Sequence, residues 1–130
     1  MNSSENWTVL QSKYFERTVV NLIKNSYRKN PKGKKKFLEL LKSILMELTN
    51  NPYCKNSYPE PSPKNMLKED EELRKYYFLL PDLKGAVAQG RIIYKINKKE
   101  KSVYLLMAYT HKQYEKRPPD DLIRKADNQF

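Results

Sequence analysis

The spacing of apolar residues changes period along this chain, and that change restricts the folds open to it. Residues 12–29 and 34–49 place apolar side chains three or four positions apart, the spacing of one helix face. Residues 90–97 alternate in polarity, and residues 102–110 are almost entirely apolar, as in a central strand. The order predicts two helices followed by a β-sheet.

A short polar segment joins the two predicted helices, which is typical of a helical hairpin. Ser12 is placed to cap the first helix. Asn30, Pro31 and Gly33 are expected to separate the helices, with Gly33 free to adopt a left-handed conformation. We interpret both apolar stripes as packing surfaces rather than grooves for a partner helix, because 130 residues need that surface for a core.

The rest of the chain predicts a loop, a meander of strands and a terminal helix. Residues 50–65 hold four of the eight prolines and predict an extended loop, followed by a helical turn at 66–72. The remaining predicted elements are strands at 74–80, 90–97 and 102–110, a turn at 98–101 and a helix at 120–128. Unbroken alternation in the last strand would place Leu105, Met107 and Tyr109 on one face, followed by His111.

Together these elements predict a single α+β domain over residues 1–130. An N-terminal helical hairpin packs on a twisted antiparallel sheet of three to four strands, a short helix ends the chain, and the helices lie on one face. Residues 1–11 are expected to form a flexible N-terminus, and residues 50–65 a Pro-rich loop.

The charge balance points to a polyanionic partner. The chain carries 26 basic and 15 acidic side chains, for a net charge of +11. Residues 12–50 hold ten basic and three acidic residues, and residues 81–117 hold nine and three. A field of this sign attracts nucleic acid, the ribosome, an anionic membrane or an acidic protein.

Several other classes of protein are disfavoured by the sequence. The single cysteine, Cys54, excludes an intramolecular disulfide and a cysteine-cluster metal site. The N-terminus lacks the features of a signal peptide, and no apolar run reaches 18 residues, so a cytoplasmic protein is expected. No phosphate-cradling glycine loop or zinc spacing is present, and we expect no cofactor and no metal.

The segment AYTHKQYEKRPPDD, residues 108–121, contains the only histidine, His111, among tyrosines and cations. Histidine is the side chain best suited to proton transfer near neutral pH. The segment can be a phosphate-handling site at a strand end, or a solvated corner before the terminal helix.

The order of these motifs resembles the RelE/ParE superfamily of toxins from type II toxin–antitoxin systems. The resemblance covers residues 12–117 and rests on Arg91-Ile92-Ile93-Tyr94 at the start of a strand and on His111-Lys112-Gln113-Tyr114 after the last strand. It implies a helical hairpin packed on an antiparallel sheet. RelE-like members cut messenger RNA in the ribosomal decoding site, ParE-like members inhibit DNA gyrase, and an antitoxin, here expected to be acidic, neutralises both.

The resemblance also implies roles for particular residues. His111 would be the base or acid, Arg91 would stabilise the phosphate, Tyr114 would stack on a base or orient the phosphate, and Lys112 would add charge. Three of these residues have an ordinary alternative: His111 as an exposed histidine, Arg91 as an arginine paired with an acid, and Tyr114 as a core tyrosine. The residues expected to contact nucleic acid are Lys34, Lys35, Lys36, Lys84, Lys116 and Arg117.

Three functions therefore stay open from the sequence. The first is a metal-independent, ribosome-dependent endoribonuclease that needs no small-molecule cofactor and no membrane. The second is a non-catalytic gyrase inhibitor, and the third is a basic RNA-binding module without enzyme activity. Loss of His111 or Tyr114 is expected to abolish cleavage only in the first.

Overall fold

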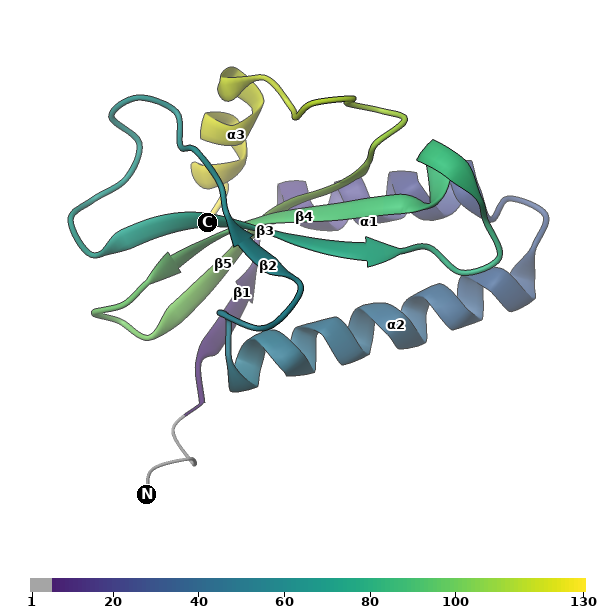
Figure 1. Cartoon of the computed structure of the whole chain (residues 1–130), viewed down its shortest axis with the longest axis horizontal. Helices are drawn as coiled ribbons and strands as arrows, with labels where there is room; N and C mark the ends of the chain where they lie inside the picture. Colours follow the sequence, from purple (N-terminus) through teal and green to yellow (C-terminus); the bar gives the residue numbers. More distant parts are fainter. Residues whose placement is uncertain (1–5) are drawn as a thin grey trace.

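Five strands form one sheet in the order β1-β5-β4-β3-β2 (Figure 1). In this computed structural model, which describes residues 6–130, β1 runs parallel to β5 and every other neighbouring pair is antiparallel. The strands are β1 (Thr8–Gln11), β2 (Ser57–Pro59), β3 (Glu71–Leu79), β4 (Gln89–Asn97) and β5 (Ser102–Thr110). The predicted α+β class with an N-terminal helical hairpin is confirmed. The sheet is larger than expected because it also contains the short edge strands β1 and β2.

The hairpin consists of α1 (Lys13–Ser26) and α2 (Pro31–Asn50). Ser12 caps α1 as predicted, since its hydroxyl accepts a hydrogen bond from the Phe15 amide at 2.9 Å. The Asn30 side chain caps α2 by accepting from the Gly33 amide at 2.9 Å. Pro31 fits the first helical position, where no amide donor is needed, so α2 starts earlier than predicted and Gly33 is helical rather than left-handed.

The two faces of the sheet are covered by different helices. The hairpin packs on one face through a core that includes Phe15, Phe37, Tyr94 and Leu105. The terminal helix α3 (Asp120–Asp127) packs on the opposite face through Ile123, as Figure 1 shows for α2 and α3. The prediction that the helices share one face is therefore wrong for α3, because β4 and β5 are apolar on both sides and both need a cover.

A β-bulge in β5 changes which side chains face α3. Ile93 pairs with Met107 and Tyr94 pairs with Leu105, so Leu106 has no partner across the ladder. Leu105 consequently faces the hairpin, whereas Met107 and Tyr109 lie in the cluster beneath α3. The prediction that Leu105 shares a face with Met107 and Tyr109 is wrong for this reason.

Both edges of the sheet use residues that the sequence analysis placed in loops. Residues 8–11 form β1 instead of a flexible terminus, because they pair with residues 102–105 of β5; residues 1–5 lie outside the described part of the chain. The Pro-rich segment 50–65 contains β2, which pairs with residues 74–76 of β3. Glu71 and Glu72 belong to β3 rather than to a helical turn.

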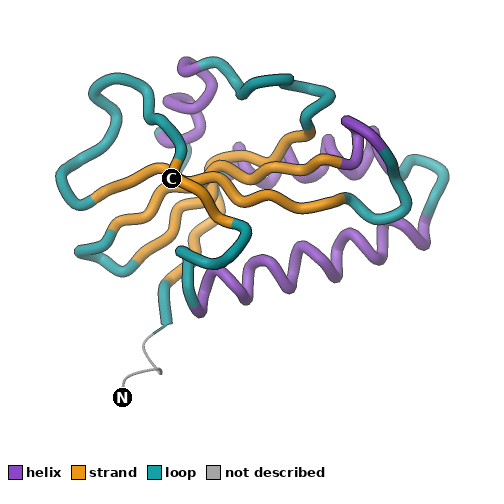
Figure 2. Tube along the Cα trace, in the orientation of Figure 1, coloured by secondary structure: helices purple, strands orange, loops and turns teal. Residues whose placement is uncertain are grey.

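The two long connections lie on the α3 side of the sheet, one between β2 and β3 and the other between β5 and α3 (Figure 2). A short 3-10 helix, η1 (Gly85–Ala88), leads into β4. Along β5, α1 covers the stretch that β1 leaves open, and the Thr18 hydroxyl accepts from the Ala108 amide at 2.9 Å. Such covering protects the strand from pairing with another chain.

Candidate functional site

Arg91 lies near the start of β4, which is the central strand of the sheet. Its side chain is on the α3 side of the sheet. It is directly opposite Tyr109 on β5 and Tyr77 on β3. Its guanidinium carbon lies 4.2 Å from the centre of the Tyr77 ring, and one nitrogen donates to the Gly90 carbonyl at 3.0 Å. Within residues 6–130 no carboxylate pairs with Arg91, so the alternative role of pairing with an acid is not observed.

His111 lies at the same end of the neighbouring strand. Its amide donates to the Gln89 carbonyl at 2.9 Å, which continues the β4–β5 ladder by one residue pair. Arg91 and His111 are thereby diagonal neighbours, and such residues in an antiparallel pair are about 7–8 Å apart. The imidazole is half-buried and makes no hydrogen bond, ion pair or ring contact within the described chain.

Tyr114 is returned to this place by a turn after β5. Its amide donates to the Thr110 carbonyl at 3.2 Å, and Gln113 accepts from the Thr110 amide at 2.9 Å. The Tyr114 ring packs edge-on against Tyr109, with centroids 5.6 Å apart. The structure thus places Arg91 opposite Tyr109 and the Tyr114 ring against it, with His111 two residues further along the chain from Tyr109.

Tyr109 is the residue that the sequence analysis did not assign to the site. Its side chain is 1% exposed, and its hydroxyl is the one buried side-chain polar atom in the described chain without a hydrogen-bond partner. Burial raises the pKa of Tyr109, and the Glu60 carboxylate acts in the same direction. The available signal was its strand phase, which is shared with His111.

An ion-pair cluster closes the site toward α3. Glu60 binds Lys75 at 3.0 Å and Arg117 at 2.7 Å, and the Glu60 and Lys75 side chains are under a tenth exposed. Arg117 also binds Asp120 at 2.6 Å. Burial lowers the pKa of Arg117, but these two carboxylates outweigh it and raise that pKa overall. Arg117 can contact nucleic acid, as the sequence suggested, only if these bonds open.

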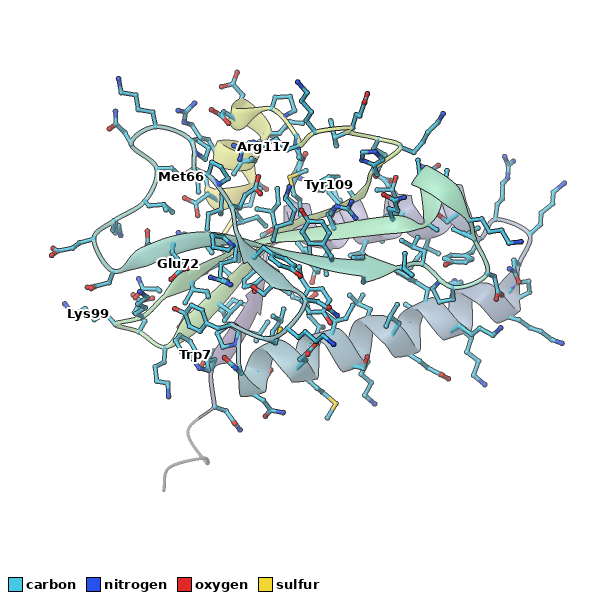
Figure 3. All side chains as sticks on the ribbon, in the orientation of Figure 1. Trp7, Met66, Glu72, Lys99, Tyr109 and Arg117 are labelled. Carbon is cyan, nitrogen blue, oxygen red and sulfur yellow. The ribbon has the colours of Figure 1, made fainter. Side chains whose placement is uncertain are left out.

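The labelled side chains lie on both sides of the sheet. Figure 3 shows Met66, Tyr109 and Arg117 on the α3 side of the sheet, with Trp7 on the other side. Met66 packs into the α3-side cluster and Trp7 into the hairpin-side core.

Two of the other predicted cations, Lys112 and Lys34, line hollows that do not include Tyr109. Lys112 is exposed and lines a hollow of about 240 Å³ together with Leu22 and Val87. Lys34 lines a second hollow, of about 640 Å³, with Lys24 and Arg28 between the two helices of the hairpin. The exposed predicted cations are Lys34, Lys35, Lys36, Lys84, Lys112 and Lys116. Lys36 binds Asp82 at 3.1 Å.

Residues 6–130 contain neither a metal-binding group of side chains nor a membrane-spanning helix. No three His, Cys, Asp or Glu side chains meet in a group that could hold a metal ion. No helix there combines the length and apolar character needed to cross a membrane.

Several solved structures resemble this chain, among them the three that follow, whereas no protein-family model and no curated protein matches it. A metal-bound toxin from Helicobacter pylori is 21% identical, with 83% of this chain and 98% of that chain covered and a TM-score of 0.50. A mutant of the E. coli toxin RelE in the free state is 16% identical, with coverages of 85% and 88% and a TM-score of 0.44. A conserved hypothetical protein from H. pylori is 20% identical, with coverages of 82% and 97% and a TM-score of 0.44.

The likeness to the metal-bound toxin is one of fold. It confirms the toxin-like α+β fold that the RelE/ParE resemblance implied. At 21% identity, the likeness shows a shared backbone fold and does not show a shared chemistry at the site.

Proposed function

We propose that this chain is the toxin of a type II toxin–antitoxin system and that it stops translation by cutting messenger RNA on the ribosome, in the cytoplasm. The observation that carries the proposal is the placement of Arg91 and His111 at the same end of β4 and β5, beside Tyr109 and Tyr114. The fold shared with a bacterial toxin and the net charge of +11 also support it.

The reaction assigned to these residues is cleavage of the RNA backbone by intramolecular transesterification at a phosphodiester. The RNA 2′-oxygen attacks the adjacent phosphorus, the bond to the 5′-oxygen breaks, and a 2′,3′-cyclic phosphate forms. His111 moves a proton to or from one of these oxygens, for which imidazole is suited near neutral pH. Arg91 donates to the phosphate oxygens, where charge builds up, and its fork shape allows two parallel hydrogen bonds.

Tyr114 and Lys112 have supporting roles in this proposal. Tyr114 packs against Tyr109 and orients a base or the phosphate beside it. Lys112 is exposed and lies beside another hollow, so its contribution is a general attraction for RNA rather than contact with the reacting phosphate.

The proposed partner that silences the toxin is an acidic antitoxin. An excess of eleven positive charges favours rapid association with a negatively charged protein. Exposed lysines at the start of α2, together with Lys24 and Arg28, provide a surface where such charges can meet.

One observation favours a second candidate function. A catalytic base is commonly oriented by a third group, and the His111 imidazole has no such partner within residues 6–130. A non-catalytic gyrase inhibitor of the ParE kind, or an RNA-binding module, requires no oriented imidazole.

The deciding experiment is cell-free translation with purified protein, read by primer extension of the messenger. Wild type is compared with His111→Gln, Arg91→Ala and, as a matched surface control, Lys99→Ala in the exposed β4–β5 turn. We expect cuts within translated codons that both site variants lose and Lys99→Ala keeps. An intact messenger and normal translation with the wild type would overturn the nuclease, and a DNA supercoiling assay with gyrase would follow.

A further inference from the structure

Two directly opposed residues on the α3 side of the sheet, Tyr109 and Arg91, have hydrogen-bond donors that are not fully used. The Tyr109 hydroxyl is buried without a partner. Arg91, across the β4–β5 ladder, uses one nitrogen on the Gly90 carbonyl and pairs with no carboxylate among residues 6–130. Burying a donor without an acceptor destabilises a fold, so phenylalanine would suit this position better if nothing bound here.

The carboxylate of Glu60, which acts on the pKa of Tyr109, is already engaged. One Glu60 oxygen binds Lys75 and the other binds Arg117. Burial raises the pKa of Tyr109, so at neutral pH its hydroxyl keeps its proton and can donate. A ligand that satisfies both free donors must therefore bring its own acceptor oxygens, and the positive guanidinium favours negatively charged ones.

Exposed aromatic rings beside these donors indicate which kind of molecule contains the negatively charged group. Tyr77 is 38% exposed and Tyr58 is 52% exposed, and their rings meet edge to face with centroids 5.3 Å apart. A hollow of about 620 Å³, lined in part by Tyr77, Leu79 and Arg91, lies where β2 no longer covers the edge of β3. Aromatic rings next to a cation in an open hollow suit the unpaired bases of single-stranded RNA.

We propose that the Tyr109 hydroxyl and the Arg91 guanidinium together bind one phosphate of single-stranded RNA, whose adjoining base stacks on the Tyr58–Tyr77 pair. The choice of RNA as ligand rests on the proposed function. Tyr109 is here a binding residue for the phosphate and takes no part in proton transfer.

Binding requires the side chains that surround the Tyr109 hydroxyl to move. Arg91 lies over the Tyr77 ring, and the Tyr109 hydroxyl has no exposed surface. A phosphate draws the guanidinium away from Tyr77, because a charge-assisted pair of hydrogen bonds is stronger than a cation–π contact on a part-exposed ring. When the Glu60–Arg117 contact over Tyr109 also opens, the hydroxyl is uncovered and becomes the second donor.

The test measures binding without cleavage. Isotope-labelled protein is titrated by NMR with inorganic phosphate and with a hexauridylate strand, following the amides of β4 and β5. Tyr109→Phe should unfold at the wild-type temperature or above and bind both ligands roughly tenfold more weakly, the loss expected for one hydrogen bond to a charged acceptor. Arg91→Lys should also bind both ligands more weakly, since lysine cannot form the two parallel hydrogen bonds of a guanidinium.

Tyr94→Phe is the matched control. The Tyr94 hydroxyl is buried on the other face, where it donates to the Pro52 carbonyl at 2.6 Å and bonds to Ser57. Its loss should lower the unfolding temperature and leave both affinities unchanged. Unchanged affinity in Tyr109→Phe would overturn the proposal, and so would binding of phosphate without binding of the strand. Tyr109-dependent binding without any cutting of messenger would leave this site standing and remove the nuclease.

Discussion

The Glu60 carboxylate accepts a hydrogen bond from the Arg117 guanidinium at 2.7 Å, although 57 positions separate the two residues. Arg117 also donates to the Pro61 carbonyl, and Glu60 binds Lys75 on β3. These bonds hold the loop after β2 against the segment before α3, over the site around Tyr109.

Glu60→Gln should destabilise the protein by about 3 kcal/mol, because it leaves Lys75 buried without a counter-charge. The free energy of unfolding in urea measures this. Asp82→Asn removes the same charge from the exposed pair with Lys36 and should leave the urea midpoint unchanged. Equal midpoints for both variants would show that the Glu60 cluster adds nothing to stability.

Acid should weaken the fold through Glu71. Burial pushes the pKa of Glu71 upward, but the Lys68 amide, Lys95 and Asn97 outweigh it and hold that pKa below its ordinary value. The folded state therefore binds this proton less tightly than the unfolded state, and the stability contributed above about pH 4.3 is lost as the pH falls further.

Urea unfolding at a series of pH values tests this contribution. Glu71→Gln should be less stable than wild type at pH 7 and should lose less stability between roughly pH 5 and pH 3. Parallel curves for the two proteins would assign the acid sensitivity to other carboxylates.

Gly33→Ala should destabilise the protein by about 1–3 kcal/mol, although alanine is the better helix former. An added methyl group would lie 2.5 Å from the Asn30 side-chain nitrogen and 2.8 Å from Tyr27. It would displace the residue that caps α2 and press on a buried ring. Thermal unfolding of Gly33→Ala and of the exposed control Lys42→Ala compares them; a higher midpoint for Gly33→Ala would show that the cap can move freely.

Replacing Lys34, Lys35 and Lys36 by alanine should weaken RNA binding and make it less dependent on salt. Each lost contact with a single strand reduces the slope of log K against log salt by about 0.7, so three contacts remove about 2. A matched triple variant at exposed Lys13, Lys42 and Lys99 should keep the wild-type slope. If both triple variants change the slope equally, attraction by net charge explains the binding without a local contact surface.

Features set by neighbouring residues were predictable from the sequence. The Ser12 cap and the bounds of β5 were predicted to the residue, since capping chemistry and an apolar run between turns are local. Features that depend on distant partners were not predictable. Residues 8–11 become a strand only because β5 offers them an edge, and the bulge at Leu106 is visible only in its register with β4.

In the candidate site, too, some features were predictable from the sequence and others were not. Arg91 and His111 were expected on neighbouring strands, and the ladder places them together. Tyr109 could not be identified from its residue type, because a tyrosine in an apolar strand looks like core until its hydroxyl is found without an acceptor. The ion pairs of Arg117 join segments of the chain that are far apart in sequence.

The parallel pairing of β1 with β5 has a consequence for synthesis. Residues 8–11 leave the ribosome about ninety residues before their partners, residues 102–105. Ser12 and Thr18 likewise bond to Leu105 and Ala108. The apolar stripes of the hairpin also pack against β5. The nascent chain therefore exposes them until β5 has left the exit tunnel, and folding is completed late.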